Sequence, residues 1–414
     1  MVIWLINPFD PLPGDPEQEG RYATLARLLV SGGHEVTWWT SSFSHRFKRP
    51  VDRQAITAAC KAIGIGVRFL TVGPYRRNVG AGRLWNHYLL AGRFGKAARM
   101  ESSAPNIVLA SVPPPMLARQ AAIFAAECGA KMIVDVQDLW PETFCRLGPG
   151  VLRPLLPAVF WLWHRAARHA YKSAEAVVGV ADAYVDRAVE LGGPKTITGT
   201  IPLGIDLAAF DIAAADGRCE QFTKPAEEIW FAYTGSLNRS YDCLTLVRAF
   251  AKIHQTLPAR ARLFITGRGE LRDKLEEIIR QQSLTNVTLT GFLDFNRWAY
   301  LLSQCDAGFN ASFPEAKIYL PNKIFYYLAG SVAVLNTIGG QCSRIVHEGH
   351  CGLDYKAGDV DSCAQAMEQT AGNRKELATL QLNSRRLAET RYDRRLLYRQ
   401  YVSLIEQVAQ NSLG

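Results

Sequence analysis

The segment SFPEAKIYLPNKIFYYLAGSVAVLNTIGG, residues 312–340, contains the residues best suited to bind an anion. It lies between two apolar runs and includes a helical pattern that begins at Pro321-Asn322-Lys323. The first backbone N–H groups of a helix lack partners within the helix, and the helix dipole is positive there, so a helix start favours phosphate. Lys323 adds a full positive charge. The sequence therefore predicts a phosphate site that includes Asn322 and Lys323.

Glycine-containing turns follow three other apolar runs in the second half of the chain. They read YTGSL (233–237), TGRGE (266–270) and TGFL (290–293). Glycine lets a backbone approach a ligand closely, and open α/β sheets bind ligands outside the carboxyl ends of their strands. Ordinary strand-to-helix turns use the same residues, and Arg239 also suits an exposed loop. The candidate ligand-binding residues at these turns are Gly235, Ser236, Arg239, Arg268, Gly291 and Phe292.

Two loops of the first half add further candidates. The run MIVDV is followed by Gln137-Asp138 and then by Leu-Trp-Pro-Glu. Asp138 is suited to orient an acceptor hydroxyl, and equally to cap the helix that follows. The loop NPFDPLPGDPEQEGRY contains Gly14, Gly20 and Arg21, where Gly14, in proline-rich surroundings, also suits a simple turn.

Short apolar runs alternate with helical patterns along the chain. Such runs, flanked by helices, are typical of parallel strands buried on both faces. The repetition of strand, helix and strand predicts an α/β fold of doubly wound domains. The runs are VIWLI (2–6), EVTWWT (35–40), VRFLTV (67–72), IVLAS (107–111), MIVDV (132–136), AVVGV (176–180), IWFAYTG (229–235), RLFITG (262–267), NVTLTG (286–291), DAGFNAS (306–312) and VAVLN (332–336).

The alternation is interrupted once, at residues 202–228, which lack a strong period. We therefore predict a Rossmann-like domain at 1–201, a linker at 202–228, a second Rossmann-like domain at 229–385 and a charged C-terminal helix at 386–414. Two such domains facing each other would form a cleft whose closure excludes water from a reaction.

Several motifs, in this order, resemble those of the retaining, family 4 glycosyltransferases of the GT-B type. PNKIFYYLA (321–329) resembles the nucleotide-sugar segment P-x-K-[LIV]-[FY]-E-Y-[LM]-A of bacterial members. DVQDLWPE (135–142) is similar to the D-x-R-D-L-W-P-E of enzymes that transfer amino sugars to lipid-linked acceptors. The stretches GGHEV, IPLGIDLAAF and HEGHCGLDYKAGD resemble further family motifs, so the resemblance covers nearly the whole chain.

The resemblance implies a GT-B fold with an interdomain cleft, in which the first domain binds the acceptor and the second binds the nucleotide sugar. The C-terminal helix would pack back on the first domain. It also implies retention of anomeric configuration, no cofactor and no essential metal, and no D-x-D motif stands at a strand end. Gly235 and Arg239 would lie at the donor diphosphate, Arg268 near the nucleotide, and Gly291 with Phe292 near the base. Gly14, Gly20 and Arg21 match the loop that reaches the diphosphate from the first domain.

The sequence departs from this family at two glutamates, one near the transferred sugar and one on the ribose. Ile318 and Tyr326 stand in their places, and Glu315 lies three residues ahead of the first. A phenol cannot accept two ribose hydroxyl protons as a carboxylate does. Glu315 could take the place of the first glutamate only if the loop is rearranged. The ribose is held otherwise, with Tyr326 as the candidate at that position, or nucleotide binding is weakened. Asp138, Glu315 and Lys323 are the catalytic candidates.

The composition is that of a folded protein without a membrane span. The chain has 414 residues, 48% hydrophobic and 21% charged. Its nine cysteines form no CxxC pair, which favours reduced thiols in a reducing compartment. MVIWLINPFD lacks the basic start of a signal peptide, and no long uncharged apolar window occurs. We expect a cytoplasmic protein.

Basic and aromatic residues are interleaved in the first half, and the net charge is +9. The segments SSFSHRFKR and PYRRNVGAGRLWNHYLLAGRFGKAARM contain no acid, and VLRPLLPAVFWLWHRAARHAYK places Trp161 and Trp163 beside cations. This composition fits an anionic lipid surface or a lipid diphosphate. A solvated basic face over core aromatics, and an ordinary core helix, remain open. No nucleic-acid motif accompanies the basic residues, so we expect no nucleic-acid partner.

The sequence thus predicts a glycosyltransferase that uses a nucleotide sugar, most simply UDP-linked, peripheral at the inner face of an anionic membrane. The acceptor would be a lipid-diphosphate-linked sugar or a saccharide in surface polysaccharide or lipopolysaccharide assembly. Two alternatives remain: a UDP-sugar 2-epimerase-like isomerase, which shares the two-domain plan, and a non-catalytic scaffold that has lost the ribose glutamate.

Overall fold

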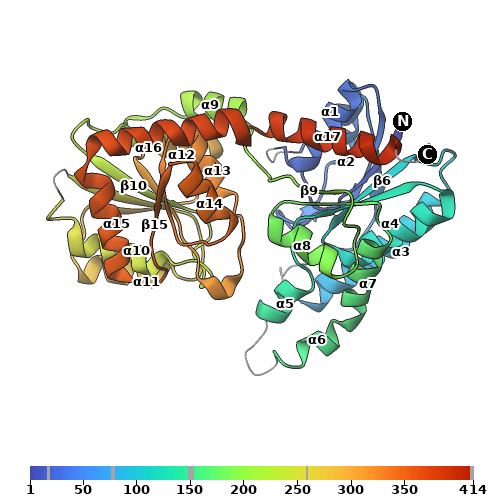
Figure 1. Ribbon diagram of the computed structural model, residues 1–414, viewed down its shortest axis with the longest axis horizontal. Coiled ribbons are helices and arrows are strands. Elements are labelled where there is room, and N and C mark those ends of the chain that lie inside the picture. Colours follow the sequence, from blue (N-terminus) through green and yellow to red (C-terminus); the bar gives the residue numbers. More distant parts are fainter. Residues whose placement is uncertain (16–18, 76–79, 148–152, 258–259, 411–414) are drawn as a thin grey trace. The chain divides into compact units, whose positions relative to one another are not determined.

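The apolar runs of the sequence form two parallel sheets, each packed against helices (Figure 1). The computed structural model describes residues 1–15, 19–75, 80–147, 153–257 and 260–410. The chain divides into a first unit, Met1–Pro202 with Leu397–Gly414, and a second unit, Leu203–Leu396.

The first unit has a seven-stranded parallel sheet in the order β5-β2-β1-β6-β7-β8-β9. Because β1 lies between β2 and β6, the strand order reverses beside it, and the β1–β6 boundary is a topological switch point. The strands are β1 (Val2–Ile6), β2 (Glu35–Ser41), β5 (Ile65–Leu70), β6 (Ile107–Val112), β7 (Lys131–Val136), β8 (Ala176–Gly179) and β9 (Thr198–Thr200), with a small hairpin of β3 (Phe43–Ser44) and β4 (Arg49–Pro50). The helices are α1 (Arg21–Ser31), α2 (Arg53–Ala62), α3 (Ala81–Ala98), α4 (Pro115–Cys128), α5 (Glu142–Leu147), α6 (Leu156–Val159), α7 (Trp161–Lys172) and α8 (Asp182–Glu190).

The second unit repeats this plan with six parallel strands in the order β12-β11-β10-β13-β14-β15. Its switch point lies between β10 and β13. The strands are β10 (Ile229–Thr234), β11 (Ala261–Thr266), β12 (Val287–Gly291), β13 (Ala307–Asn310), β14 (Ala333–Asn336) and β15 (Gly352–Asp354). The helices are α9 (Leu207–Asp216), α10 (Cys243–Ile253), α11 (Arg272–Gln281), α12 (Phe295–Gln304), α13 (Lys323–Ala329), α14 (Gln341–Glu348), α15 (Val360–Gly372) and α16 (Arg374–Leu387), and a π-helical turn (Ala388–Tyr392) leads into α17 (Arg394–Gln410).

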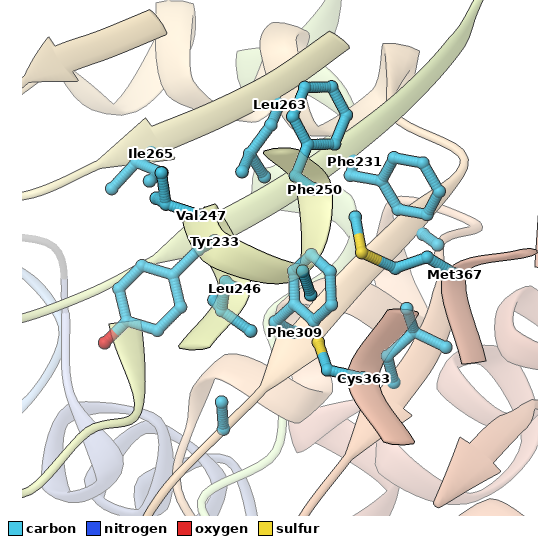
Figure 2. Packing of buried hydrophobic residues seen from close by; sticks show 14 of the residues in the cluster. Phe231, Tyr233, Leu246, Val247, Phe250, Leu263, Ile265, Phe309, Cys363 and Met367 are labelled. Carbon is cyan, nitrogen blue, oxygen red and sulfur yellow. The ribbon is translucent and has the colours of Figure 1, made fainter. Parts of the chain in front are cut away.

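The core of the second unit shows why these strands are apolar on both faces. Phe231 and Phe309, from neighbouring strands, stack with their ring centroids 6.0 Å apart, and α10 covers them with Phe250 (Figure 2). Met367 of α15 lies in the same cluster. Burial of each such side chain contributes roughly 1.5–3 kcal/mol, so the sheet is held chiefly by packing.

The α/β prediction is confirmed, and each of the eleven predicted strands is present. Their ends differ by one or two residues. Two short strands, β9 and β15, and the hairpin β3–β4 were not predicted. The stretch 202–228, predicted as a linker, contains a helix: α9 begins after Asp206, whose carboxylate accepts a hydrogen bond from Ala209 N (3.0 Å). Phe210 of α9 packs against Trp298, so this segment is part of the second unit.

All nine cysteines lie among the described residues, and none forms a disulfide. None of the helices in the described ranges has both the length and the apolar character needed to cross a membrane.

Candidate functional site

The turns after β10, β11 and β12 are bonded to one another through their backbones. Gly235 N donates to Thr266 O (2.9 Å), and Gly267 N donates to Gly291 O (2.8 Å). Gly267 has a φ of 148°, and a Cβ there would lie 1.8 Å from Gly235 O. No side chain fits between these turns. The carboxyl edge of the second sheet is therefore a surface of backbone groups, as a bound nucleotide requires.

Lys323 lies next to this edge with its charge unsatisfied. Its side chain is buried, with only 8% of the residue exposed, and Nζ lies 4.2 Å from the centroid of the Tyr233 ring and 4.1 Å from that of Tyr241. Nζ has no hydrogen-bond partner among the described residues. It lies 3.3 Å from where a Cβ of Gly235 would be. Burial lowers the pKa of Lys323 to about 7. An anion at Gly235 would supply the partner that the ammonium lacks.

The charge of Lys323 matters more here than the helix that it begins. Helix α13 spans only seven residues, and Asn322 makes no side-chain capping bond at its start. A helix of two turns has a small dipole, so the anion affinity predicted for this helix start rests on the side chain.

Arg268 and Phe292 form the rim of the same edge. The Arg268 guanidinium lies 5.2 Å from the centroid of the Phe292 ring, which is exposed. This pair offers a flat surface on which a base can stack. Arg239 is largely exposed and lies 3.5 Å from Glu270, and Ser236 is exposed beside Gly235. The structure thus brings the predicted residues of the three turns to one edge.

Tyr326, which stands where the family has its ribose glutamate, packs edge-to-face on Trp298 with ring centroids 4.7 Å apart. Trp298 Nε1 donates to Thr234 Oγ1 at the end of β10 (2.8 Å). Glu315 lies exposed in a short 3₁₀ turn, Pro314–Ala316, before Lys317. Whether either residue contacts the donor stays a prediction.

Sequence reasoning missed Tyr233, Tyr241 and Trp298. Tyr233 lies within an apolar run and reads as a core residue, and only the fold shows that its ring covers Lys323. The signal available in the sequence was aromatic residues on both sides of the Gly235 turn.

In the first unit, the Asp138 carboxylate is occupied within its own turn. It accepts hydrogen bonds from Leu139 N (2.8 Å), Trp140 Nε1 (2.8 Å) and Thr143 Oγ1 (3.0 Å). The side chain therefore fixes the turn ahead of α5 and the position of Trp140. Its predicted role toward an acceptor hydroxyl stays a prediction, and any such role must share the carboxylate with these donors.

Arg21 lies in the interior of the first unit. Its guanidinium is buried and donates to both Asp135 oxygens at 3.0 Å and to Ile201 O at 2.6 Å. It also lies 5.2 Å from the centroid of Tyr398 and 4.8 Å from that of Tyr401. These contacts engage the guanidinium inside the first unit, and its predicted contact with a diphosphate stays a prediction. Arg21 joins α1, β7 and α17.

The two glycines predicted beside Arg21 serve the packing of their own loop. Gly14 has a φ of 87°, and a Cβ there would meet Ala55 O of α2 at 2.9 Å. Gly20 precedes α1, and a Cβ there would lie 3.0 Å from the Asp10 carboxylate. The predicted role of both glycines at the donor diphosphate stays a prediction.

Comparison with known proteins agrees with this architecture. Residues 20–204 match the family model of the glycosyl transferase 4-like domain, and residues 228–373 match that of glycosyl transferases group 1. The two matched ranges together span most of the chain. A search of curated proteins gave no match.

Solved structures of similar fold cover nearly the whole chain. HepE from Anabaena, in complex with UDP and glucose, has a TM-score of 0.68 at 16% identity over 98% of this chain and 100% of that chain. Sucrose-phosphate synthase from Thermosynechococcus elongatus has a TM-score of 0.69 at 18% identity, over 99% of this chain and 100% of that chain. WaaG, a glycosyltransferase involved in lipopolysaccharide biosynthesis, has 0.65 at 14% identity over 100% of both chains.

Two Rossmann-like units with parallel sheets, together with these matches, define a GT-B glycosyltransferase. The chain belongs to the GT-B glycosyltransferases of the family 4 type.

Proposed function

We propose that this glycosyltransferase moves a sugar from a UDP-linked donor to a lipid-linked or saccharide acceptor with retention of anomeric configuration. The observation that carries the proposal is Lys323, a buried ammonium beside the backbone edge at Gly235 that has no hydrogen-bond partner in the part of the chain that the structure describes. HepE has been crystallised with UDP and with UDP-glucose, which supports the choice of base. WaaG supports a role in lipopolysaccharide or related polysaccharide assembly.

The chemistry follows from the charge that develops on the leaving diphosphate when its bond to the sugar breaks. Protonated Lys323, held under two tyrosine rings, donates hydrogen bonds to that diphosphate in surroundings poor in water, where such bonds are strongest. Arg239, at the exposed rim, adds a second positive charge, and Arg268 with Phe292 holds the base. No resident metal is required in this scheme, and activity in the presence of a chelator tests that expectation.

The same proposal places the protein at the inner, anionic leaflet of a membrane through α6 and the start of α7. Four large apolar side chains there are more than half exposed: Leu155, Val159, Trp161 and Leu162. Arg165 lies 4.8 Å from the centroid of the Trp161 ring, and no acid occurs between Glu142 and Glu175. Exposed apolar groups among cations suit the headgroup region of anionic lipids.

The test is thermal unfolding of the purified chain with UDP-, GDP-, dTDP- and ADP-sugars. A ligand that binds only the native state raises the midpoint. We expect a shift with UDP-sugars that is lost in Lys323→Ala. No shift with any donor at millimolar concentration would favour the scaffold alternative. Conversion of the UDP-sugar to its epimer without an acceptor would favour the isomerase.

A further inference from the structure

A cluster of basic side chains lies beyond the carboxyl edge of the first sheet. His45 and Lys48 come from the β3–β4 hairpin, Tyr75 follows β5, and Arg83 lies on α3. His45 Nδ1 lies 2.6 Å from the Tyr75 hydroxyl and 3.2 Å from Lys48 Nζ, which is 4.7 Å from the centroid of the Tyr75 ring. Arg83 also hydrogen bonds to Tyr75. His45 and Arg83 therefore hydrogen bond to Tyr75, while Lys48 lies over the Tyr75 ring and donates to His45 O.

These groups are close enough, and buried enough, to disfavour one another's charge. Burial, then Arg83 and Lys48, lowers the pKa of His45 to about 3. Burial, then Arg83, lowers the pKa of Lys48. His87, fully buried on α3 with both ring nitrogens unpartnered among the described residues, has its pKa lowered by burial and then by Arg83 and His45.

Asp138 is the carboxylate that acts on this cluster, but it does not neutralise it. Asp138 acts electrostatically on Arg83, but its oxygens already accept hydrogen bonds from Leu139, Trp140 and Thr143. Among the residues that the structure describes, no carboxylate contributes to the lowered pKa of His45 or of Lys48. With its pKa at about 3, His45 is neutral at neutral pH, so the two like charges of the cluster are Lys48 and Arg83. Two like charges held close together are costly, and an anion placed between them reduces that cost.

The cluster also lies where an α/β sheet binds ligands. Phe9 follows β1 at the switch point of the first sheet, and its ring centroid lies 5.5 Å from that of His45 and 5.4 Å from that of His87. The Arg83 guanidinium lies 4.4 Å from the centroid of the Trp140 ring. Basic groups thus share the site with aromatic rings, which suits a phosphate joined to a sugar or an apolar chain.

We propose that His45, Lys48, Tyr75 and Arg83 form an anion subsite that binds a phosphate or diphosphate group of the acceptor. The inference rests on the proposed function, because it identifies the acceptor as a phosphate-linked molecule. Lys48 and His45 are half-buried and supply the accessible side of the subsite, while Arg83 and Tyr75 form its buried floor.

The experiment is calorimetric titration of inorganic pyrophosphate into the full chain carrying Lys323→Met, which removes the cation of the donor site. We expect saturable binding, weakened roughly tenfold or more by Lys48→Gln, the loss of one charge-assisted phosphate contact. Lys48→Arg should restore most of the affinity. Arg49→Gln is the matched control: it removes the same charge from the same hairpin, where Arg49 is exposed over Phe47.

Absence of pyrophosphate binding, or equal weakening by Lys48→Gln and Arg49→Gln, would overturn the subsite. Its failure is distinguishable from failure of the proposed function, because the thermal shift by UDP-sugar reports the donor site alone and should persist in Lys48→Gln. Once an acceptor is in hand, Lys48→Gln should raise KM for a phosphate-linked acceptor and leave KM for an unphosphorylated saccharide unchanged. The reverse pattern also contradicts the proposal.

Discussion

At the residue scale, Lys323 combines burial, aromatic contact and a missing hydrogen-bond partner in one side chain. Its choice as a candidate was possible from PNKIF alone, because a lysine in that motif needs no long-range information. The tyrosine rings around it were not predictable, since Tyr233 and Tyr241 are separated from the lysine in the sequence by several strands and helices. The ion pair of Arg21 was not predictable for the same reason: its partner Asp135 is far away along the chain.

Donor affinity should depend on pH through Lys323. With a pKa of about 7 in the free protein, the amine is charged below pH 7 and neutral above it. A bound diphosphate favours the charged form, so binding above pH 7 must take up a proton. We expect the affinity for a UDP-sugar to be flat below pH 7 and to fall by up to roughly tenfold per pH unit above it. Calorimetry between pH 6 and pH 8.5 in two buffers measures both effects, and Lys323→Met should show neither.

The same lysine should destabilise the free protein. Because burial lowers its pKa from 10.5 in the unfolded chain to about 7, the unfolded state binds the extra proton between these values. The loss in the free energy of unfolding that Lys323 causes is therefore complete below pH 7 and disappears as the pH rises toward 10.5. Lys323→Met should raise the free energy of unfolding at pH 6 by on the order of a few kcal/mol, and much less at pH 10. Equal effects at both pH values in urea unfolding would contradict this assignment.

At the element scale, the strands were predictable because a parallel strand buried on both faces reads as an unbroken apolar run. β9 and β15 were missed because they have three residues each, too few for a pattern. The helix α9 was missed because LAAFDIAAAD is apolar apart from Asp211 and Asp216 and shows no amphipathic period. The grouping of the three glycine turns at one edge depends on the order of the strands, because these turns are distant from one another in sequence.

The backbone bonding of the three turns predicts a strict requirement for glycine at position 267. Gly267→Ala places a Cβ 1.8 Å from Gly235 O and forces alanine to adopt a φ of 148°. We expect a loss of about 2–4 kcal/mol in the free energy of unfolding and a loss of donor binding. Gly339→Ala is the matched control, because nothing lies within 4 Å of its Cβ position. Urea unfolding of both variants measures this loss. Equal free energies of unfolding for the two variants would contradict the prediction and show that the turns separate readily.

At the scale of the whole molecule, charge and exposed apolar surface are unevenly distributed. The net charge is +9, yet the residues from Glu142 to Glu175 enclose a stretch with no acid at all, and the exposed side chains of α6 and α7 lie within it. Composition alone left a core helix and a membrane-contacting helix as alternatives. In the structure Trp163 is buried against Tyr88 and Trp161 is exposed, so α7 has a core face and an exposed face; contact of the exposed face with a membrane stays a prediction.

Binding of the intact chain to lipid vesicles should therefore depend on both features of this stretch. We expect co-sedimentation with vesicles containing phosphatidylglycerol, little with phosphatidylcholine alone, and weakening as salt is raised, because the charged contacts are screened. Trp161→Glu should reduce binding about tenfold or more, since it removes buried apolar area and adds a repelled charge. Leu382→Glu in α16 of the second unit is the control, because Leu382 is at least as exposed as Trp161 and lies outside this stretch. Equal losses in the two variants would assign the binding to net charge, and unchanged binding by Trp161→Glu would assign the membrane contact to another face.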